Sequence, residues 1–250
     1  MIRNQLQIDP NLGSNAQYFN PFGPNFIHFT LNENIQTLLL NCVNDFRQQE
    51  DIKKEVDVKG QVIQGIRASE NQKNSIVDGE TYMIPPGWQR EHHANIVANT
   101  ILDITMQYGM NTALRSADDL GLRTTPHLKE NMLNEAKLFL PEVNEAWYVV
   151  LKAGDFHILH EHNYAGATLS GSIYLEVPEQ LEEQYPQGTM NWIVGGRSGG
   201  MYNSIWGITP QPGDVFIWPS WIRHTVYPFR GDGERTMISF NSLIKVKKDE

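Results

Sequence analysis

The chain has 250 residues, of which 40% are hydrophobic and 20% charged, and its formal net charge is -9 at pH 7. This acidic surplus argues against non-specific binding to nucleic acid or to an anionic membrane surface. The sequence has a single cysteine and no apolar run near the roughly 20 residues that a membrane-spanning helix needs, so we expect a cytoplasmic protein without internal disulfides.

The N-terminal region predicts an irregular arm followed by an amphipathic helix. Residues 1–30 are rich in Asn and Pro and show no sustained period, so we expect them to be irregular. Apolar residues then recur at the i, i+3, i+4, i+7 spacing of a helix between residues 35 and 46. Cys42 lies on this apolar stripe, which predicts a buried small side chain and not a reactive thiol.

The next part of the chain predicts further helices with polar connections. Short strands are expected around residues 56–58 and 62–66, within a polar stretch. A second helix is expected over residues 97–108, with Gly109 as its stop. A third is expected over residues 125–140, because it opens on a Thr-Pro pair that suits a first helical turn.

After Pro141 the apolar period changes to two, which predicts a β region. Strands are expected at residues 147–151, 156–163, 168–177, near 192, and at 204–208, 214–218, 224–227 and 234–244. The fold class predicted is mainly β with helical additions (α+β), around a double-stranded β-helix, the jelly-roll core of cupins. Residues 1–140 would supply the arm and supporting helices and residues 141–250 the β-helix core, in one integrated domain. The long connection 178–203 is expected to act as a lid or binding loop.

Three histidines in the β region have the spacing of a metal site. His160 and His162 are two residues apart on a predicted strand, so their side chains project from one face while Glu161 turns away. His224 lies far along the chain, on another predicted strand. Imidazole is a good ligand for Fe, Zn, Cu and Ni, so these histidines predict a metal site with open coordination positions.

A carboxylate ligand remains an alternative at this stage. The set His160, Glu161 and His224, or a set that includes His157, would require a β-bulge in the first strand. Asp155 lies in a predicted turn and is a weaker candidate.

An arginine follows the histidines at the head of the last predicted strand. The planar guanidinium of Arg235 could clamp a carboxylate through two parallel hydrogen bonds. Alternation places Met237, Ser239 and Asn241 on the same side of this strand. Ser239 or Asn241 could therefore donate a hydrogen bond to a cosubstrate or substrate.

Residues from about 145 to 245 resemble the 2-oxoglutarate- and Fe(II)-dependent dioxygenase superfamily. The resemblance rests on the H-x-H at 160–162, Leu169-Ser-Gly-Ser-Ile-Tyr-Leu175, Trp218-Pro-Ser-Trp-Ile-Arg-His224 and Arg235-Thr-Met-Ile-Ser-Phe-Asn241. The usual superfamily pattern is H-x-D/E, then H, then R, so His162 stands where a carboxylate is common.

The resemblance implies Fe(II) bound by His160, His162 and His224, and 2-oxoglutarate bound through its far carboxylate by Arg235. Tyr174 matches a tyrosine that contacts 2-oxoglutarate in the prolyl-hydroxylase relatives. The implied activity is hydroxylation of a substrate that the sequence does not identify, with O2 consumed and succinate and CO2 released. Two alternatives remain: a three-histidine cupin-type metal oxygenase without 2-oxoglutarate, and a non-enzymatic β-helix protein that binds a small ligand. A homodimer is compatible with the sequence.

Overall fold

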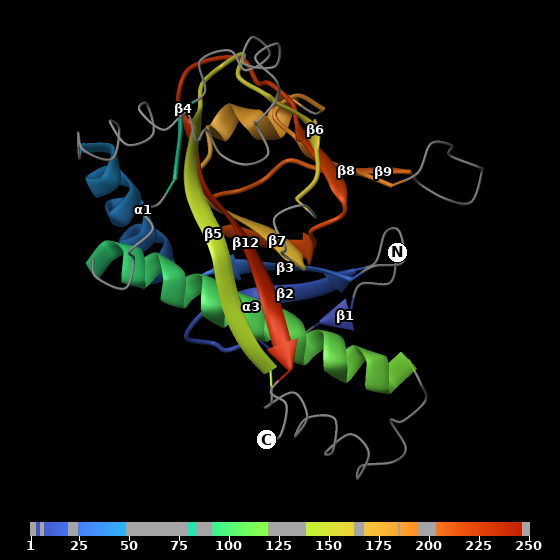
Figure 1. The fold of residues 1–250 in the computed structure, drawn as a ribbon. Helices are drawn as coiled ribbons and strands as arrows, with labels where there is room; N and C mark the ends of the chain where they lie inside the picture. Colours follow the sequence, from blue (N-terminus) through green and yellow to red (C-terminus); the bar gives the residue numbers. More distant parts are fainter. Residues whose placement is uncertain are drawn as a thin grey trace.

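In the described part of the chain, two antiparallel sheets face each other and two α-helices cover the outer face of the larger sheet (Figure 1). The computed structural model describes residues 4–5, 8–19, 25–48, 80–83, 92–119, 139–162, 168–184, 186–194 and 204–246. The helices are α1 (Glu33–Gln48) and α3 (His92–Asp119), and a short 3-10 helix spans Glu179–Gln184. No helix in these ranges is long and apolar enough to cross a membrane.

The larger sheet has the strand order β1-β2-β3-β10-β7-β12-β5-β4, and the smaller sheet has the order β6-β11-β8-β9. The strands are β1 (Asn4–Gln5), β2 (Gly13–Phe19), β3 (Phe26–Leu31), β4 (Glu80–Met83), β5 (Phe139–Leu151), β6 (His157–His160), β7 (Leu169–Glu176), β8 (Met190–Ile193), β9 (Ile205–Ile208), β10 (Asp214–Pro219), β11 (Arg223–Val226) and β12 (Arg235–Val246). The strands predicted after Pro141 are all present, within a few residues except that β5 begins earlier. Two facing antiparallel sheets of this kind form a double-stranded β-helix.

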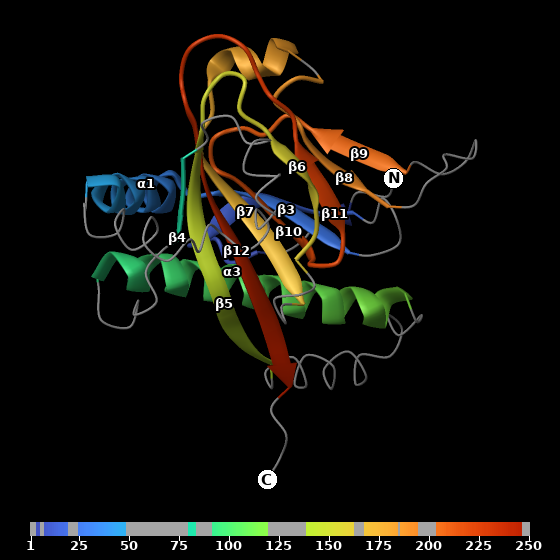
Figure 2. The same cartoon turned by 45° about the horizontal axis from the view of Figure 1, so that its top comes forward.

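Side-chain alternation gives the larger sheet two faces with different partners. On β5, Tyr148 and Val150 face α1 and α3, whereas Trp147 and Val149 face the smaller sheet. Figures 1 and 2 show both helices on the side of the larger sheet that is away from β6 and β8. Cys42 of α1 is fully buried on the helix-covered face, as predicted, and burial together with Asp45 raises the pKa of its thiol to about 11.

The expectation of an irregular N-terminal arm was wrong for the residues that the structure describes. Strand β3 pairs with β10, from Ile27 opposite Ile217 to Thr30 opposite Asp214, and β2 pairs with β3. The sequence of β3, Phe-Ile-His-Phe-Thr-Leu, is rich in residues that favour strands, so a local signal was present. The Asn- and Pro-rich sequence before it obscured that signal.

The predicted stop at Gly109 was also wrong, because α3 continues to Asp119. A glycine inside a helix costs about 1 kcal/mol relative to alanine. The fully buried side chains of Val97, Ile101 and Ile104 anchor α3 on the sheet and outweigh that cost.

Two predicted features fall mainly on parts of the chain that the structure does not describe. The short strands at 56–58 and 62–66 lie outside the described residues. Most of the predicted helix 125–140 lies outside them too, and its last two residues begin strand β5.

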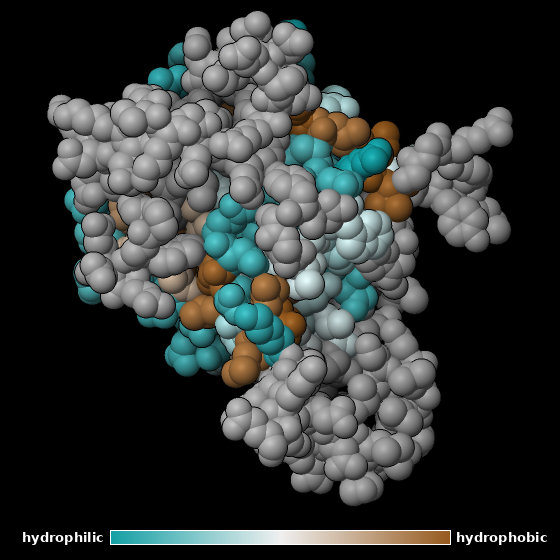
Figure 3. All heavy atoms as spheres, in the orientation of Figure 1, coloured by the Kyte–Doolittle hydropathy of each residue, from teal (hydrophilic) through white to brown (hydrophobic). Residues whose placement is uncertain are grey.

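Large hydrophobic side chains on the described surface are scattered. Figure 3 shows brown residues between hydrophilic ones over the lower ends of β5 and β12 and beside β6 and β9. Among the large hydrophobic side chains of the described residues, Leu140 and Ile205 are the most exposed, at 49% and 53%. Single exposed hydrophobic residues are normal and indicate no docking surface by themselves.

Candidate metal and cosubstrate site

Strand β6 carries a β-bulge that decides which of its histidines face the interior. His160 lies opposite His224 on β11, but His157 lies opposite Val226, so three steps on β6 match two steps on β11. In a regular strand, residues three apart face opposite sides. The extra residue of a bulge removes that constraint. As a result, both His157 and His160 line the pocket between the two sheets.

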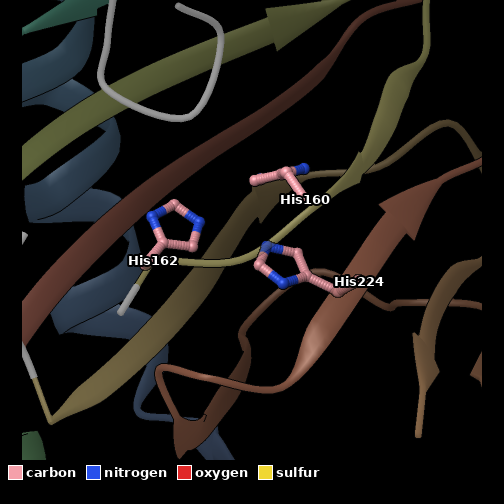
Figure 4. A group of neighbouring side chains, drawn as sticks. All are labelled: His160, His162 and His224. Atoms are coloured by element: carbon pink, nitrogen blue, oxygen red, sulfur yellow. The ribbon is translucent and has the colours of Figure 1, made fainter. Parts of the chain in front are cut away.

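The structure brings His160, His162 and His224 together, with their rings converging from β6, the segment after it, and β11 (Figure 4). The ring centroids are 4.2 Å apart for His160 and His224, 5.0 Å for His160 and His162, and 5.1 Å for His162 and His224. One ring nitrogen from each lies within 4.8 Å of the others. The backbone N–H of His162 donates to the carbonyl of Ser220 at 2.9 Å, which fixes the segment after β6.

Backbone carbonyls fix the tautomers of two of these rings. Nδ1 of His160 lies 2.6 Å from the carbonyl oxygen of Ile158, and Nδ1 of His224 lies 3.2 Å from that of Ile222. A carbonyl only accepts hydrogen bonds, so both Nδ1 atoms carry hydrogen. The Nε2 atoms of His160 and His224 therefore present lone pairs to a metal.

A side-chain amide contacts the third ring. Nδ2 of Asn241 lies 3.2 Å from Nδ1 of His162 and donates to Oε1 of Glu145 at 2.6 Å, while its Oδ1 accepts from Ser170 at 2.8 Å. In this orientation Nδ1 of His162 accepts; with the amide reversed, Nδ1 would donate and Nε2 would be free for a metal. The Ser170 hydroxyl suits both orientations. Burial raises the pKa of Glu145, and the hydrogen bond from Asn241 opposes this shift.

All four histidines around the pocket are held in the neutral form that binds metals. Burial, helped by neighbouring charged groups, lowers the pKa of His157 and of His162 to about 3. Burial also lowers the pKa of His160, and places that of His224 well below its ordinary value. Little work is then needed to remove protons from these rings when a cation binds.

The alternative carboxylate ligands lie elsewhere. Oε2 of Glu161 is 3.4 Å from Nε of Arg223, and this pair is partly exposed at the outer side of the strands. Asp155 accepts a hydrogen bond from the backbone N–H of Lys152 at 2.8 Å, inside the turn before β6. Neither carboxylate joins the cluster of histidines.

Arg235 is fully buried and only partly satisfied. Its Nη1 donates to the carbonyl of Gly188 at 2.6 Å, and its Cζ lies 5.8 Å from the centre of the Phe229 ring. Its Nε and Nη2 have no hydrogen-bond partner among the described residues. Burial lowers the pKa of this guanidinium, against the opposing influence of Tyr174 and Asp155. Two free N–H groups on a buried planar cation fit a carboxylate.

Tyr174 lies beside Met237 on the inner face and is fully buried. Its hydroxyl donates to the sulfur of Met190 at 3.1 Å, and a thioether is a weak acceptor. Burial raises the pKa of the phenol, so the hydroxyl keeps its proton and remains available to a better acceptor.

The pocket between the sheets has an empty volume of about 410 Å³. Its lining consists of Trp147, His157, His160, His162, Ser170, Gly171, Ser172, Met190, Trp218, His224, Val226, Met237, Ser239 and Phe240. Ser239 thus lies at the pocket, as expected, whereas Asn241 lies behind His162. Among the described residues, the lining contains no Asp, Glu, Lys or Arg.

The sequence analysis did not predict two residues that surround His162, one in direct contact and one through Asn241. The Trp147 ring stacks on it, with centroids 5.6 Å apart and planes 23° from parallel, and Glu145 holds its partner Asn241. The predicted strand began at residue 147, whereas β5 begins at Phe139. Extending the alternation backwards would have placed Glu145 on the same face as Trp147.

Residues 145–241 match a protein family described as "Putative 2OG-Fe(II) oxygenase". The matched segment contains all seven predicted site residues. Over this segment, which is less than half of the chain, the sequence is similar to that oxygenase family. The family description names 2-oxoglutarate and Fe(II), and His160, His162 and His224 form a group that could hold a metal ion. No curated protein matches the sequence.

Solved structures share the fold at low sequence identity. A prolyl hydroxylase from Trichoplax adhaerens, in complex with a peptide of a hypoxia-inducible factor, has a TM-score of 0.50 and 13% identity over 87% of this chain and 83% of that chain. A Pseudomonas putida prolyl-4-hydroxylase has a TM-score of 0.45 and 16% identity over 86% and 91%. A 2OG-Fe(II) oxygenase family oxidoreductase from Burkholderia pseudomallei matches over only 41% of this chain and 44% of its own, with 17% identity and a TM-score of 0.34. The first of these confirms the double-stranded β-helix.

Proposed function

We propose that His160, His162 and His224 hold Fe(II), and that Arg235 and Tyr174 bind the far carboxylate of 2-oxoglutarate. The observation that carries this proposal is the buried guanidinium of Arg235, which has two N–H groups without partners among the described residues. A buried cation whose hydrogen bonds are not all satisfied is costly, so a site that keeps one is suited to an anionic ligand. The three neutral imidazoles nearby suit a metal.

In this proposal the metal lies at one end of the pocket, and Arg235 and Tyr174 lie behind the wall at the other end. The histidines line one end, and Met190, Val226 and Met237 line the other. Met237 is two residues beyond Arg235 on β12, and Met190 is two residues beyond Gly188, whose carbonyl accepts from Arg235. Methionine side chains are flexible, so they can move to admit a ligand chain between the metal end and the guanidinium.

Each of the proposed site residues then has a defined role in substrate hydroxylation. His160 and His224 bind through Nε2 lone pairs that are free at neutral pH, and His162 does the same with the Asn241 amide reversed. Arg235 and Tyr174 hold the cosubstrate by its far end, and Ser239 offers a hydroxyl to the cosubstrate or substrate from the pocket wall. The apolar wall around them limits the access of water. When bound, Fe(II) and 2-oxoglutarate supply the activation of O2 that oxidises the substrate and leaves succinate and CO2.

The lining also bears on the primary substrate. Because the described lining has no acidic side chain and no lysine or arginine, nothing in it would neutralise a charged group next to the histidines. We therefore propose that the reacting C–H group belongs to an uncharged part of the substrate, whatever charge the rest of that molecule carries.

An anaerobic titration tests the proposal without knowledge of the substrate. Iron-loaded protein should develop a visible charge-transfer band when 2-oxoglutarate is added, and should release succinate slowly once O2 is admitted. The three-histidine oxygenase that uses no 2-oxoglutarate predicts neither result. Iron-loaded protein without the band and without succinate would therefore decide against 2-oxoglutarate as the cosubstrate.

A further inference from the structure

We propose that His157 is a third hydrogen-bond donor to the far carboxylate of 2-oxoglutarate, beside Arg235 and Tyr174. This inference rests on the proposed function above and adds a cosubstrate-binding residue to it. It assigns a role to the one pocket histidine that the metal cluster does not use.

The first argument is that the backbone departs from a regular strand to bring His157 inward. The bulge in β6 turns this side chain to the same side as His160, and its ring is only 6% exposed. Its Nε2 atom is buried and has no hydrogen-bond partner among the described residues. A histidine kept only for packing would leave this polar atom unsatisfied, and buried polar atoms normally have partners.

The second argument is position. His157 lies opposite Val226, which lies opposite Met190 on the next strand. The sulfur of Met190 accepts a hydrogen bond from the hydroxyl of Tyr174. The carbonyl of Gly188, two residues earlier, accepts one from the guanidinium of Arg235. These pairings place His157 at the Arg235 end of the pocket. Neither Arg235 nor Tyr174 is part of the pocket wall itself, so His157 is the polar side chain that an entering carboxylate meets there.

The third argument is the count of donors. An ionised carboxylate has about four lone-pair sites for hydrogen bonds. In a bidentate fork Arg235 offers one N–H from Nε and one from Nη2, and Tyr174 offers one hydroxyl, which leaves one site open. A neutral imidazole supplies one N–H and adds no further positive charge to the interior. With His157 the carboxylate is fully satisfied and the site is close to neutral.

The test compares two 2-oxo acids on iron-loaded protein under anaerobic conditions, with binding read from the charge-transfer band. The first is 2-oxoglutarate, and the second is 2-oxobutyrate, which has the same metal-binding head but no far carboxylate. In His157→Leu the dissociation constant for 2-oxoglutarate should rise about 10- to 100-fold, as expected for a lost hydrogen bond to a charged group. The constant for 2-oxobutyrate and the iron content should stay the same.

Matched variants separate this role from damage to the strand. His157→Gln keeps an N–H donor of similar reach and should restore most of the affinity for 2-oxoglutarate. Leu159→Ala, on the same strand but 46% exposed, should bind both acids like the wild type. His157→Ala carries the same expectation as His157→Leu without the bulk of leucine, in case that variant does not fold.

Several outcomes would overturn the assignment. An unchanged constant for 2-oxoglutarate in His157→Leu or His157→Ala would exclude a carboxylate contact. An equal loss of affinity for both acids would indicate a structural role, and a loss of iron would make His157 a metal ligand. A wild type that binds neither acid would instead reject the proposed function, and this inference with it.

Discussion

At the histidine end of the pocket, Nδ1 of each ligand candidate already has a hydrogen-bond partner, whereas at the Arg235 end two guanidinium N–H groups have none among the described residues. The partners at the first end are backbone carbonyls and one side-chain amide, all supplied by the protein. At the second end Tyr174 has only a sulfur atom to receive its hydroxyl. One end is organised before anything binds, and the other is completed by what binds.

This difference has a thermodynamic meaning. Groups with partners in the protein contribute to its stability whether or not a ligand is present. Groups without partners lower the free energy of unfolding of the ligand-free protein. An anion that binds to them in the native state raises that free energy again. Stability measurements with and without each ligand should therefore separate the two ends.

The largest effect is expected from breaking the histidine end. His224→Ala removes a lone pair that no neighbouring side chain replaces, so the protein should lose stoichiometric iron, measured by metal analysis after gel filtration. Glu161→Gln is the matched control, because its carboxylate faces Arg223, and it should keep the full iron content. If Glu161→Gln loses iron instead, the ligand set that includes the Glu161 carboxylate is the right one.

Arg235→Met removes the guanidinium at the opposite end of the pocket. Loss of a buried charge partner should weaken 2-oxoglutarate binding by at least a hundredfold, equivalent to about 3–5 kcal/mol, while iron binding stays intact. The free energy of unfolding of the ligand-free protein should change by no more than about 1 kcal/mol, because removal of a buried charge with unsatisfied N–H groups offsets the lost hydrogen bond to Gly188. Thermal unfolding with and without 2-oxoglutarate measures both quantities. A large loss of stability without ligand would mean that the guanidinium is already well paired.

Asn241→Leu sharpens the picture of the histidine end. It removes the amide that contacts Nδ1 of His162 and leaves the ring free to turn or change tautomer. Iron affinity should fall about 10- to 100-fold, the usual cost of losing a group that orients a metal ligand. Competition with a chelator of known affinity gives the number. Ser170→Ala, which removes only a neighbour of the amide, should have a smaller effect, and the reverse ranking would contradict the assigned order of contacts.

The smallest effect concerns pH and belongs mainly to the histidine end. Because burial holds the pKa of His157 and of His162 at about 3, the unfolded chain binds more protons than the folded chain between about pH 6.5 and pH 3. The stability of the metal-free protein should fall as the pH falls through 6.5, by on the order of 1 kcal/mol per buried histidine for each pH unit. Denaturant unfolding at pH 7.5 and 5.5 measures the slope. His162→Leu should reduce it, and a slope that this variant leaves unchanged would locate the protons elsewhere.

The sequence predicted the features that follow from local periodicity. The i, i+2 spacing of His160 and His162 placed them on one face, and the structure brings both to His224. The apolar stripe between residues 35 and 46 became α1. In these cases one period, read along a short stretch, determines which side chains are buried together.

What the sequence did not predict depends on interruptions of a period or on distant partners. A strict period of two sends His157 away from His160, and only the bulge reverses this. Asn241 was expected near the cosubstrate, yet Glu145 and His162, both remote in sequence, hold it. Strand β3 is a different case, because its own residues favour a strand and only the Asn- and Pro-rich sequence before it concealed this.

The pairing of β3 with β10 also constrains how the protein is made. Ile27 leaves the ribosome long before Ile217, its partner in the sheet. At roughly 5–20 residues per second, β3 waits on the order of ten seconds or more for its neighbour. During that time β3 has β2 as a neighbour, but its edge toward β10 is unpaired and its side chains Phe29 and Leu31, buried in the finished fold, lack their later partners. If segment 145–241 were made alone, it would lack α1 and α3, and the apolar sheet face that these helices cover would be exposed to solvent. In both cases the incomplete fold exposes apolar surface and strand edges, which favour aggregation.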